Sequence, residues 1–382
     1  MTAVADRLHT AGLVLPDYGG LSLDRVLPAA LGAVGAPVPA GAGDAQAARQ
    51  RLGVPVADRV VVVLVDGLGH RMLTERAGHA PFLRRRLADA TVLTCGFPST
   101  TATSMGLFGT GQPAGRTGLA GYTVRHPDGG LGNLVSWEGM GEPRRWQREP
   151  SLLGHAAELG VAVGSVGPAA FARSGLTEAA LSGATYVGAE SLEARVDAAL
   201  ELLRRGTALV YLYWGQVDKA GHQHGWRSPQ WGDELAATDF ELGRLARSVP
   251  RGTTVVVTAD HGMVDVDRSQ LVDVAAEPAL RADVELVAGE PRATHVHTAP
   301  GTAGTVAQRW RERLGDAAVV LPRDEAVAAG LFGEVAGHVV PVIGDLVVAA
   351  TGVAGVVDSR TQTPHSLLLR GMHGSLTAGE MQ

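Results

Sequence analysis

Acidic and histidine side chains follow several stretches of the sequence that read as buried strands. Asp66 ends "VVVLVDG", and Asp260 and His261 follow "TTVVVTADHGM". Asp218 and His222 lie four residues apart after "LVYLYWGQ", a spacing that puts both on one face of a helical turn. Taken singly, each aspartate is equally a turn former or a helix cap. Because ligands bind at the carboxyl ends of strands in open α/β sheets, their shared position predicts one site.

Carboxylates and imidazoles together are typical ligands of zinc, in sites that keep open positions. The candidates are too many for one tetrahedral ion, and the sequence therefore favours two metal ions. Two ions about 3.5–4 Å apart hold the attacking and the leaving oxygen of a phosphoryl group during its displacement. The predicted chemistry is metal-assisted phosphoryl transfer.

A run of hydroxyl residues follows "CGFP" in the segment "CGFPSTTATSMGLFGTG". Pro98 cannot continue a strand ladder and Ser99 can cap a helix. Thr100 or Thr101 then falls at a helix N-terminus, where free N–H groups and the helix dipole favour anions. A hydroxyl held there by a metal could attack phosphorus. The alternative from this segment alone is an ordinary capping run.

Alternating strand and helix patterns must position these residues. Apolar, β-branched runs predict strands at 59–66, 91–96, 161–167, 207–214 and 253–259. Amphipathic patterns predict helices at 80–90, 151–160, 191–206 and 229–249. This order predicts a mostly parallel sheet with helices on both faces.

The composition divides the chain into a lead-in and one large domain. Residues 1–57 are rich in Ala, Gly and Pro and predict a surface wrap with short helices, and residues 58–382 form the predicted catalytic domain. The rhythm becomes irregular from about 270 to 370, which predicts an inserted α+β subdomain. There "THVHT" places His295 and His297 on a strand, where they form an exposed face or line the cleft.

Bulk properties exclude several classes of function. The net charge is −6 and aromatic residues make up 4%, so we expect no nucleic-acid polymer as a partner. The single cysteine, Cys95, excludes an internal disulfide and a four-cysteine zinc site, and reads as a buried strand residue. No signal peptide is visible and no apolar run approaches about 18 residues. We expect a cytoplasmic protein with no membrane span, and its oligomeric state stays open.

Five motifs, in this order, resemble a known family: "VDGLG", "FPSTTATS", "VDKAGHQHG", "TADHGM" and "GMHG". Over residues 58–382 they are similar to the type I phosphodiesterase/nucleotide pyrophosphatase family of the alkaline phosphatase superfamily. The resemblance implies an alkaline phosphatase-like three-layer α/β/α sandwich. It matches Asp66, Asp260 and His261 to ligands of a metal that also holds the nucleophile, and matches the nucleophile to Thr101, with Thr100 as the alternative. It matches the second metal's ligands to Asp218, His222 and His373.

The same resemblance implies a two-zinc hydrolase, with manganese as an alternative metal. The enzyme would cleave phosphodiester or pyrophosphate bonds of small nucleotide-like substrates through a phosphothreonine. The family's nucleophile is followed by Phe-Pro-Asn, whereas Ala102, Thr103 and Ser104 follow Thr101 here. Ser104 is therefore the candidate that replaces the asparagine as a substrate ligand.

Other activities stay open on the same motifs. "MHGSLTAGE" also resembles phosphonoacetate hydrolases. A phosphomonoesterase and a phosphomutase with two manganese ions are further alternatives on this fold. A non-catalytic metal-binding protein is the alternative from another class.

Overall fold

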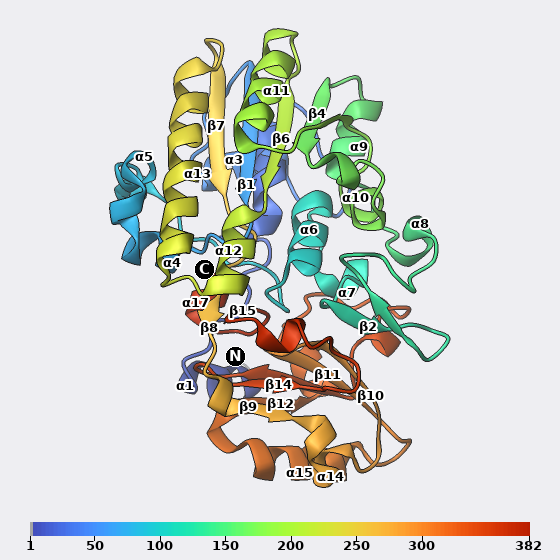
Figure 1. Ribbon diagram of the computed structural model, residues 1–382. Coiled ribbons are helices and arrows are strands. Elements are labelled where there is room, and N and C mark those ends of the chain that lie inside the picture. The colour runs from blue at the N-terminus through green and yellow to red at the C-terminus, as the bar shows by residue number, and fades with distance from the viewer. Residues whose placement is uncertain (1–2) are drawn as a thin grey trace.

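A five-stranded parallel sheet forms the centre of the structure, a computed structural model that describes residues 3–382 (Figure 1). The strand that Asp66 follows lies between the two strands that precede Asp218 and Asp260, and it pairs in parallel with both. The prediction of an α/β fold with a parallel central sheet is confirmed. In spatial order the strands are β5 (Thr185–Gly188), β4 (Val163–Gly167), β6 (Leu209–Trp214), β1 (Arg59–Val65) and β7 (Thr253–Thr258).

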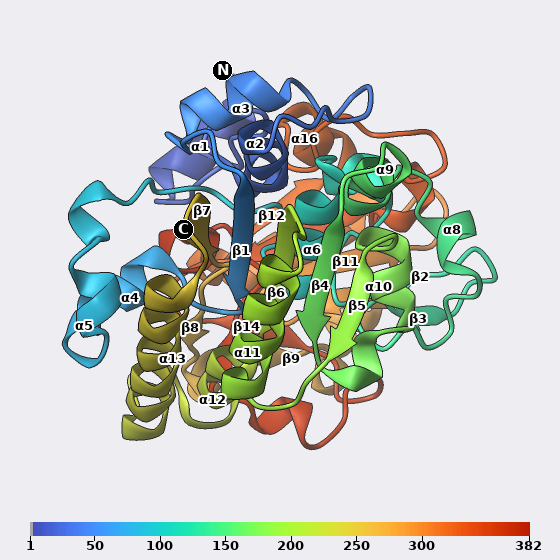
Figure 2. The ribbon, with the colours of Figure 1, turned by 90° about the horizontal axis from the view of Figure 1, so that it is seen from above.

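Alternate residues of β1 face two different hydrophobic clusters. Val60, Val62 and Leu64 pack in one cluster, and Val61 and Val63 pack in the other. Because successive side chains of a strand point to opposite faces, this run is apolar at every position. Figure 2 shows the helices on the two sides of the sheet. Those of the first cluster are α2 (Val26–Ala33), α3 (Ala45–Arg51), α6 (Thr101–Thr110) and α9 (Leu152–Glu158), and those of the second are α11 (Leu192–Arg204) and α13 (Pro229–Ser248).

Residues 3–57 contain three short α-helices, and all eight residues of one of them, α2, are buried against the sheet. One expectation about the first hundred residues is wrong. The segment 91–96 was expected to be a strand, but it makes only an isolated parallel bridge, between Ser22 and Thr94. The Cys95 N–H donates instead to the Met381 carbonyl, 2.9 Å away, so Cys95 is buried outside any strand. Backbone hydrogen bonds from this segment to residues 21–23 and to Met381 replace pairing with the central sheet.

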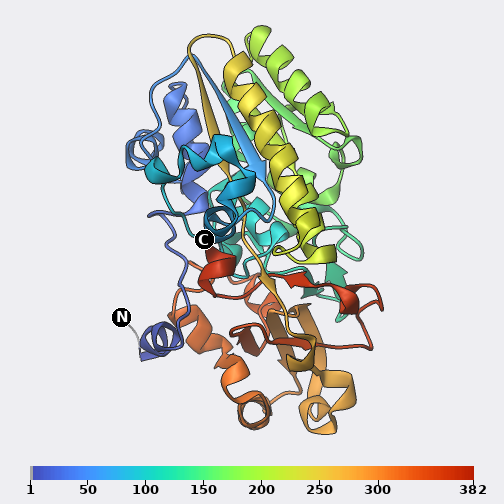
Figure 3. The ribbon, with the colours of Figure 1, turned by 60° about the vertical axis from the view of Figure 1, so that its left-hand side comes forward.

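A second, antiparallel sheet lies beyond the carboxyl ends of the central strands (Figures 1 and 3). It contains His295 and His297, which are both buried rather than exposed. One of its faces packs on a cluster that includes Trp310. The sheet consists of β10 (Val284–Glu290), β11 (Ala293–Thr298), β13 (Leu346–Ala350) and β12 (Ala318–Pro322), with α15 (Ala303–Leu314) beside it.

The remaining elements are short. They are α1 (Ala3–Thr10), α4 (His70–Glu75), α5 (Pro81–Arg84), α7 (Ala114–Thr117), α8 (Pro143–Trp146), α10 (Gly175–Ala180), α12 (Gln216–His224), α14 (Pro278–Arg281), α16 (Arg323–Ala328), α17 (Ala378–Met381), β2 (Thr123–Arg125), β3 (Leu131–Asn133), β8 (Val264–Asp265), β9 (Leu271–Asp273), β14 (Gly355–Val357) and β15 (Gly371–Met372). Within residues 3–382, no helix is long and apolar enough to cross a bilayer.

A buried ion pair ties α17 to the turn between β10 and β11 of the second sheet. Arg292 donates from Nε to Glu380 Oε1 at 3.0 Å and from Nη2 to Oε2 at 2.7 Å, and neither side chain is exposed. The same carboxylate accepts from the Ser375 N–H and the Thr377 hydroxyl. Glu380 therefore fixes the turn that directly follows His373.

Replacing Arg292 by Met is expected to lower the free energy of unfolding by about 3–5 kcal/mol, because the substitution leaves the Glu380 carboxylate buried without its cation. Urea unfolding followed by circular dichroism measures this loss. Arg7→Ala is the matched control, since Arg7 forms an exposed pair with Glu325. A loss as small as that of the control would show that Glu380 is neutral or hydrated.

Candidate active site

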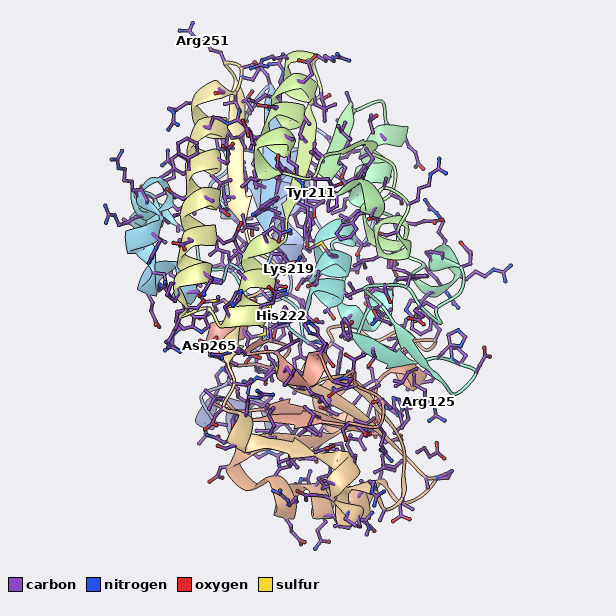
Figure 4. All side chains as sticks on the ribbon, viewed as in Figure 1. Arg125, Tyr211, Lys219, His222, Arg251 and Asp265 are labelled. Carbon is purple, nitrogen blue, oxygen red and sulfur yellow. The ribbon has the colours of Figure 1, made fainter. Side chains whose placement is uncertain are left out.

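Three turns at one edge of the central sheet bring the predicted ligands together. Asp66 directly follows β1, Asp260 lies two residues after β7, and α12 begins two residues after β6. The N–H of Gly67 donates to Asp260 Oδ1 at 3.0 Å, which joins two of these turns. Gly67 has φ 71, and a Cβ there would lie 2.8 Å from Asp218 Cβ, so only glycine fits. Figure 4 shows His222 at the lower end of α12, on the side of the central sheet that faces the second sheet.

The first group of candidate ligands contains Asp66, Asp260 and His261. One ligand atom from each lies within 4.8 Å of the others. His261 Nε2 is 3.5 Å from Asp66 Oδ1 and 3.5 Å from Asp260 Oδ2. His261 Nδ1 lies 3.0 Å from the Gly262 carbonyl, to which it donates, so the lone pair on Nε2 faces the two carboxylates.

Thr101 joins this first group. It is the first residue of α6, and its Oγ1 lies 3.3 Å from His261 Nε2. Thr100 precedes the helix and lies against the buried carboxyl of Glu290 instead. The structure therefore brings Thr101, and not Thr100, to the predicted ligands.

The second group contains Asp218, His222 and His373. His222 Nε2 is 3.3 Å from Asp218 Oδ2, and His373 Nε2 is 3.2 Å from His222 Nε2 and 3.8 Å from Asp218 Oδ1. The other ring nitrogens donate to backbone carbonyls, His222 to Gly371 at 2.7 Å and His373 to Ser99 at 2.9 Å. Such bonds orient metal-ligating histidines in general. The rings of His261 and His373 stack with centroids 3.8 Å apart, so the two groups adjoin.

The electrostatics of the cluster fit bound cations. Among residues 3–382, one buried carboxylate oxygen on each of Asp66, Asp218 and Asp260 has no hydrogen-bond partner. Burial, followed by the charges of Asp260 and Asp218, raises the pKa of Asp66 well above its usual value. Burial, followed by His261 and His222, lowers the pKa of His373 well below its usual value. Gathered anions and imidazole lone pairs of this kind are the donor set of divalent metals, and the residues present fit two such ions.

The prediction for Ser104 disagrees with this geometry. Ser104 lies one turn after Thr101 in α6 and is fully buried. Its hydroxyl donates to the Asp260 carbonyl at 2.8 Å. The proton that would contact a phosphate is therefore already used, and Ser104 instead braces the turn that carries Asp260.

Tyr213 is a site residue that the sequence interpretation missed. Its hydroxyl donates to Asp66 Oδ2 at 2.6 Å, and it pairs across the sheet with Leu64 of β1. The sequence feature that could have identified Tyr213 is its position near the end of β6, the strand beside the one that Asp66 follows. The bond holds Asp66 Oδ2 so that Oδ1 faces His261.

Tyr213→Phe is expected to weaken metal binding about 10- to 100-fold, because it removes a hydrogen bond that orients a candidate ligand. Titration of metal into the chelator-treated protein, followed by calorimetry, measures this change. Tyr211→Phe is the matched control, because the Tyr211 hydroxyl donates to the sulfur of Met105, at 3.6 Å, and not to any of the candidate ligands. Equal affinities in the two variants would contradict a role for Tyr213 at Asp66.

A small apolar pocket adjoins Thr101. Its volume is about 80 Å³, and it is lined by side chains that include Thr101, Met105, Phe171 and Tyr213. The Phe171 and Tyr213 rings lie 5.9 Å apart, and Phe171 is partly exposed at the rim. An apolar, planar group could therefore lie beside the hydroxyl of Thr101.

Solved structures of known enzymes share this fold. Murine ectonucleotide pyrophosphatase/phosphodiesterase 5 aligns with a TM-score of 0.67 and 17% identity over 85% of this chain and 86% of that one. Phosphonoacetate hydrolase from Sinorhizobium meliloti 1021, in complex with phosphonoformate, aligns with a TM-score of 0.62 and 19% identity over 86% and 89% of the chains. At these identities the likeness establishes the fold.

Sequence comparisons give the family. Human ectonucleotide pyrophosphatase/phosphodiesterase family member 7 is 35% identical over 65 residues, a stretch that spans 16% of this chain and only 14% of the human protein. The family model for type I phosphodiesterase / nucleotide pyrophosphatase matches residues 60–376, which include every candidate ligand. This chain therefore belongs to the type I phosphodiesterase/nucleotide pyrophosphatase family.

Proposed function

We propose that this protein hydrolyses phosphodiester or pyrophosphate bonds of small nucleotide-like substrates, with Thr101 as the nucleophile and two divalent metal ions. One observation carries the proposal. Thr101 Oγ1 lies 3.3 Å from His261 Nε2, which is 3.5 Å from one carboxylate oxygen each of Asp66 and Asp260, and these two oxygens accept no hydrogen bond from residues 3–382. A hydroxyl held among such ligands is the arrangement that activates a weak nucleophile.

The chain divides the catalytic work between its two groups of ligands. Asp66, Asp260, His261 and Thr101 would hold one metal, and Asp218, His222 and His373 would hold the other. Bound zinc or manganese supplies a Lewis acid that stabilises the ionised hydroxyl and the charge on phosphorus. Thr101 lies at the start of the ten-residue helix α6, whose free N–H groups favour the phosphate oxygens.

The covalent steps involve Thr101 alone among the side chains. Its hydroxyl gives up its proton, and its oxygen bonds to phosphorus as the bond to the leaving alcohol or phosphate breaks. The leaving group takes up a proton, and the phosphothreonine that forms still carries the other ester group of the substrate. Water then attacks that phosphorus, the bond to Thr101 breaks, and the threonine hydroxyl is restored. The murine neighbour was also solved as an inactive Thr→Ala variant in complex with AMP, which supports a threonine nucleophile and a nucleotide product for this chain.

The aromatic pocket favours a substrate with a planar group. Phe171 and Tyr213 border Thr101, and their rings are the surfaces on which a nucleobase stacks. The phosphonoacetate hydrolase neighbour makes phosphonate cleavage the second candidate. In this chain that reaction would use the same candidate nucleophile and ligands, and it would break a carbon–phosphorus bond where a diester has an ester bond.

Rates on three substrates test the proposal. The metal-loaded protein is assayed with bis-p-nitrophenyl phosphate, p-nitrophenyl phosphate and phosphonoacetate under one set of conditions. Faster cleavage of the diester supports the proposed function. Faster cleavage of the monoester indicates a phosphatase, and faster cleavage of phosphonoacetate indicates the second candidate. Failure to cleave any of the three while two metals are bound would overturn enzymatic function.

A further inference from the structure

A second cavity, separate from the predicted metal ligands, lies between the β2–β3 hairpin, α8 and the second sheet. Its volume is about 610 Å³, within the range typical of small-molecule sites. Figure 4 shows Arg125 on the hairpin, away from His222 on α12. The charged and histidine side chains that the argument uses are Arg125, Arg145, Arg148, His297, Arg323 and Asp345.

Positive charge exceeds negative charge in the lining. Asp345 is the one acidic residue there, and both its oxygens are used: Oδ1 accepts from Arg323 Nη2 at 2.7 Å and Oδ2 from the Thr298 N–H at 2.8 Å. Arg125 forms an ion pair with Glu285 at 3.1 Å, and Arg145 forms one with Glu142 at 3.6 Å. Neither glutamate lines the cavity.

Arg148 forms no ion pair with any residue between 3 and 382. Its only polar contact is a long one, from Nε to the Arg145 carbonyl at 3.4 Å. Its guanidinium therefore keeps free donors, and a guanidinium binds phosphate or carboxylate through two parallel hydrogen bonds.

A buried histidine lines the same cavity. His297 is 1% exposed, and its Nε2 has no hydrogen-bond partner among residues 3–382. Burial, followed by the charges of His295 and Arg125, lowers the pKa of His297 to about 3, so the ring is neutral near pH 7. A buried polar atom without a partner is costly, and one that belongs to the lining of a cavity points to a hydrogen bond with a ligand.

We infer that this cavity binds a small phosphate-bearing anion at a site distinct from the proposed active site. Arg125 and Arg148 would bind the phosphate oxygens, and His297 would donate one further hydrogen bond from Nε2. Arg323 would add its charge while it stays bound to Asp345. No residue of this cavity belongs to the two groups of metal ligands, so the site does not depend on the proposed reaction.

Equilibrium dialysis of the full-length, metal-loaded protein against radiolabelled inorganic phosphate tests the inference. The Arg125→Ala/Arg148→Ala variant is expected to bind one phosphate per chain fewer than the unmodified protein, through a loss of affinity of about tenfold or more. Arg247→Ala/Arg251→Ala is the matched control, because it removes the same charge far away, and Arg251 lies at the opposite end of the molecule (Figure 4). The control is expected to bind as the unmodified protein does.

The inference is tested by the difference in bound phosphate per chain between the two double variants, because phosphate bound at the metal centre contributes equally to both. No difference, or an equal loss in the control, would overturn the inference whether or not the proposed catalytic function holds. Circular dichroism verifies that both variants are folded. His297→Leu is expected to lower the affinity for the same phosphate. Unchanged affinity would show that His297 is not a ligand of the phosphate. Competition by AMP for the phosphate that the Arg125→Ala/Arg148→Ala variant no longer binds would identify the anion as a nucleotide phosphate, whereas competition by pyrophosphate alone for that phosphate would identify it as a free inorganic anion.

Discussion

Thr101→Ala is expected to lower the turnover of a phosphodiester by roughly 10³- to 10⁶-fold, the range seen when an enzyme loses its nucleophile. Thr101 Oγ1 is the hydroxyl that lies beside His261 and the unpartnered oxygens of Asp66 and Asp260. Without it, water would have to attack phosphorus directly, and the step that forms phosphothreonine would disappear. Steady-state rates on bis-p-nitrophenyl phosphate measure the loss.

Two further variants separate the chemistry of Thr101 from its neighbourhood. Thr101→Ser keeps a hydroxyl and is expected to keep part of the activity. Thr100→Ala changes the adjacent threonine, which lies against Glu290, and is expected to keep most of it. Acid quenching during turnover should reveal a phosphorylated peptide that contains residue 101 in the unmodified protein and in Thr100→Ala, and no such peptide in Thr101→Ala. Activity in Thr101→Ala close to that of the unmodified protein would show that the nucleophile is a different group.

Much of the central sheet could be predicted because β1, β4 and β6 are buried on both faces. From Val60 to Val65, β1 is apolar at every position, and the acid that follows then stands out. Asp260 follows the apolar centre of β7 in the same way. Parallel pairing of β1 with β6 and β7 places the ends of these strands side by side, so the sequence alone predicted that their acids meet.

The errors came from contacts that leave no periodic signal. Ser104 read as a free hydroxyl, but tertiary packing places it under the Asp260 carbonyl. The segment 91–96 has the composition of a strand, yet its partners are the Leu21–Leu23 segment and Met381, which are remote in sequence. The Tyr213 bond to Asp66 depends on strand order and register, which local patterns do not specify. The same holds for the cavity around Arg148, whose lining comes from widely separated segments.

His222→Ala is expected to reduce the bound metal from about two ions per chain to about one and to lower the rate on a diester by more than about 100-fold. His222 Nε2 faces Asp218 and His373, while the first group of ligands is complete without it. Loss of this side chain should therefore empty one position and leave the other filled. Elemental analysis of the dialysed protein measures metal content, and assays on the same sample measure the rate.

His224→Ala is the matched control, since His224 lies two residues further along α12, is exposed, and belongs to neither group of ligands. It is expected to keep both ions and the full rate. Loss of both ions from His222→Ala would show that the two positions fill together, as the stacked rings of His261 and His373 would allow. Retention of both ions with full activity would contradict the assignment of His222 as a ligand. Asp218 and His222 lie on α12, and His373 follows β15. A loss confined to one ion would therefore place the second metal position between α12 and the turn that carries His373.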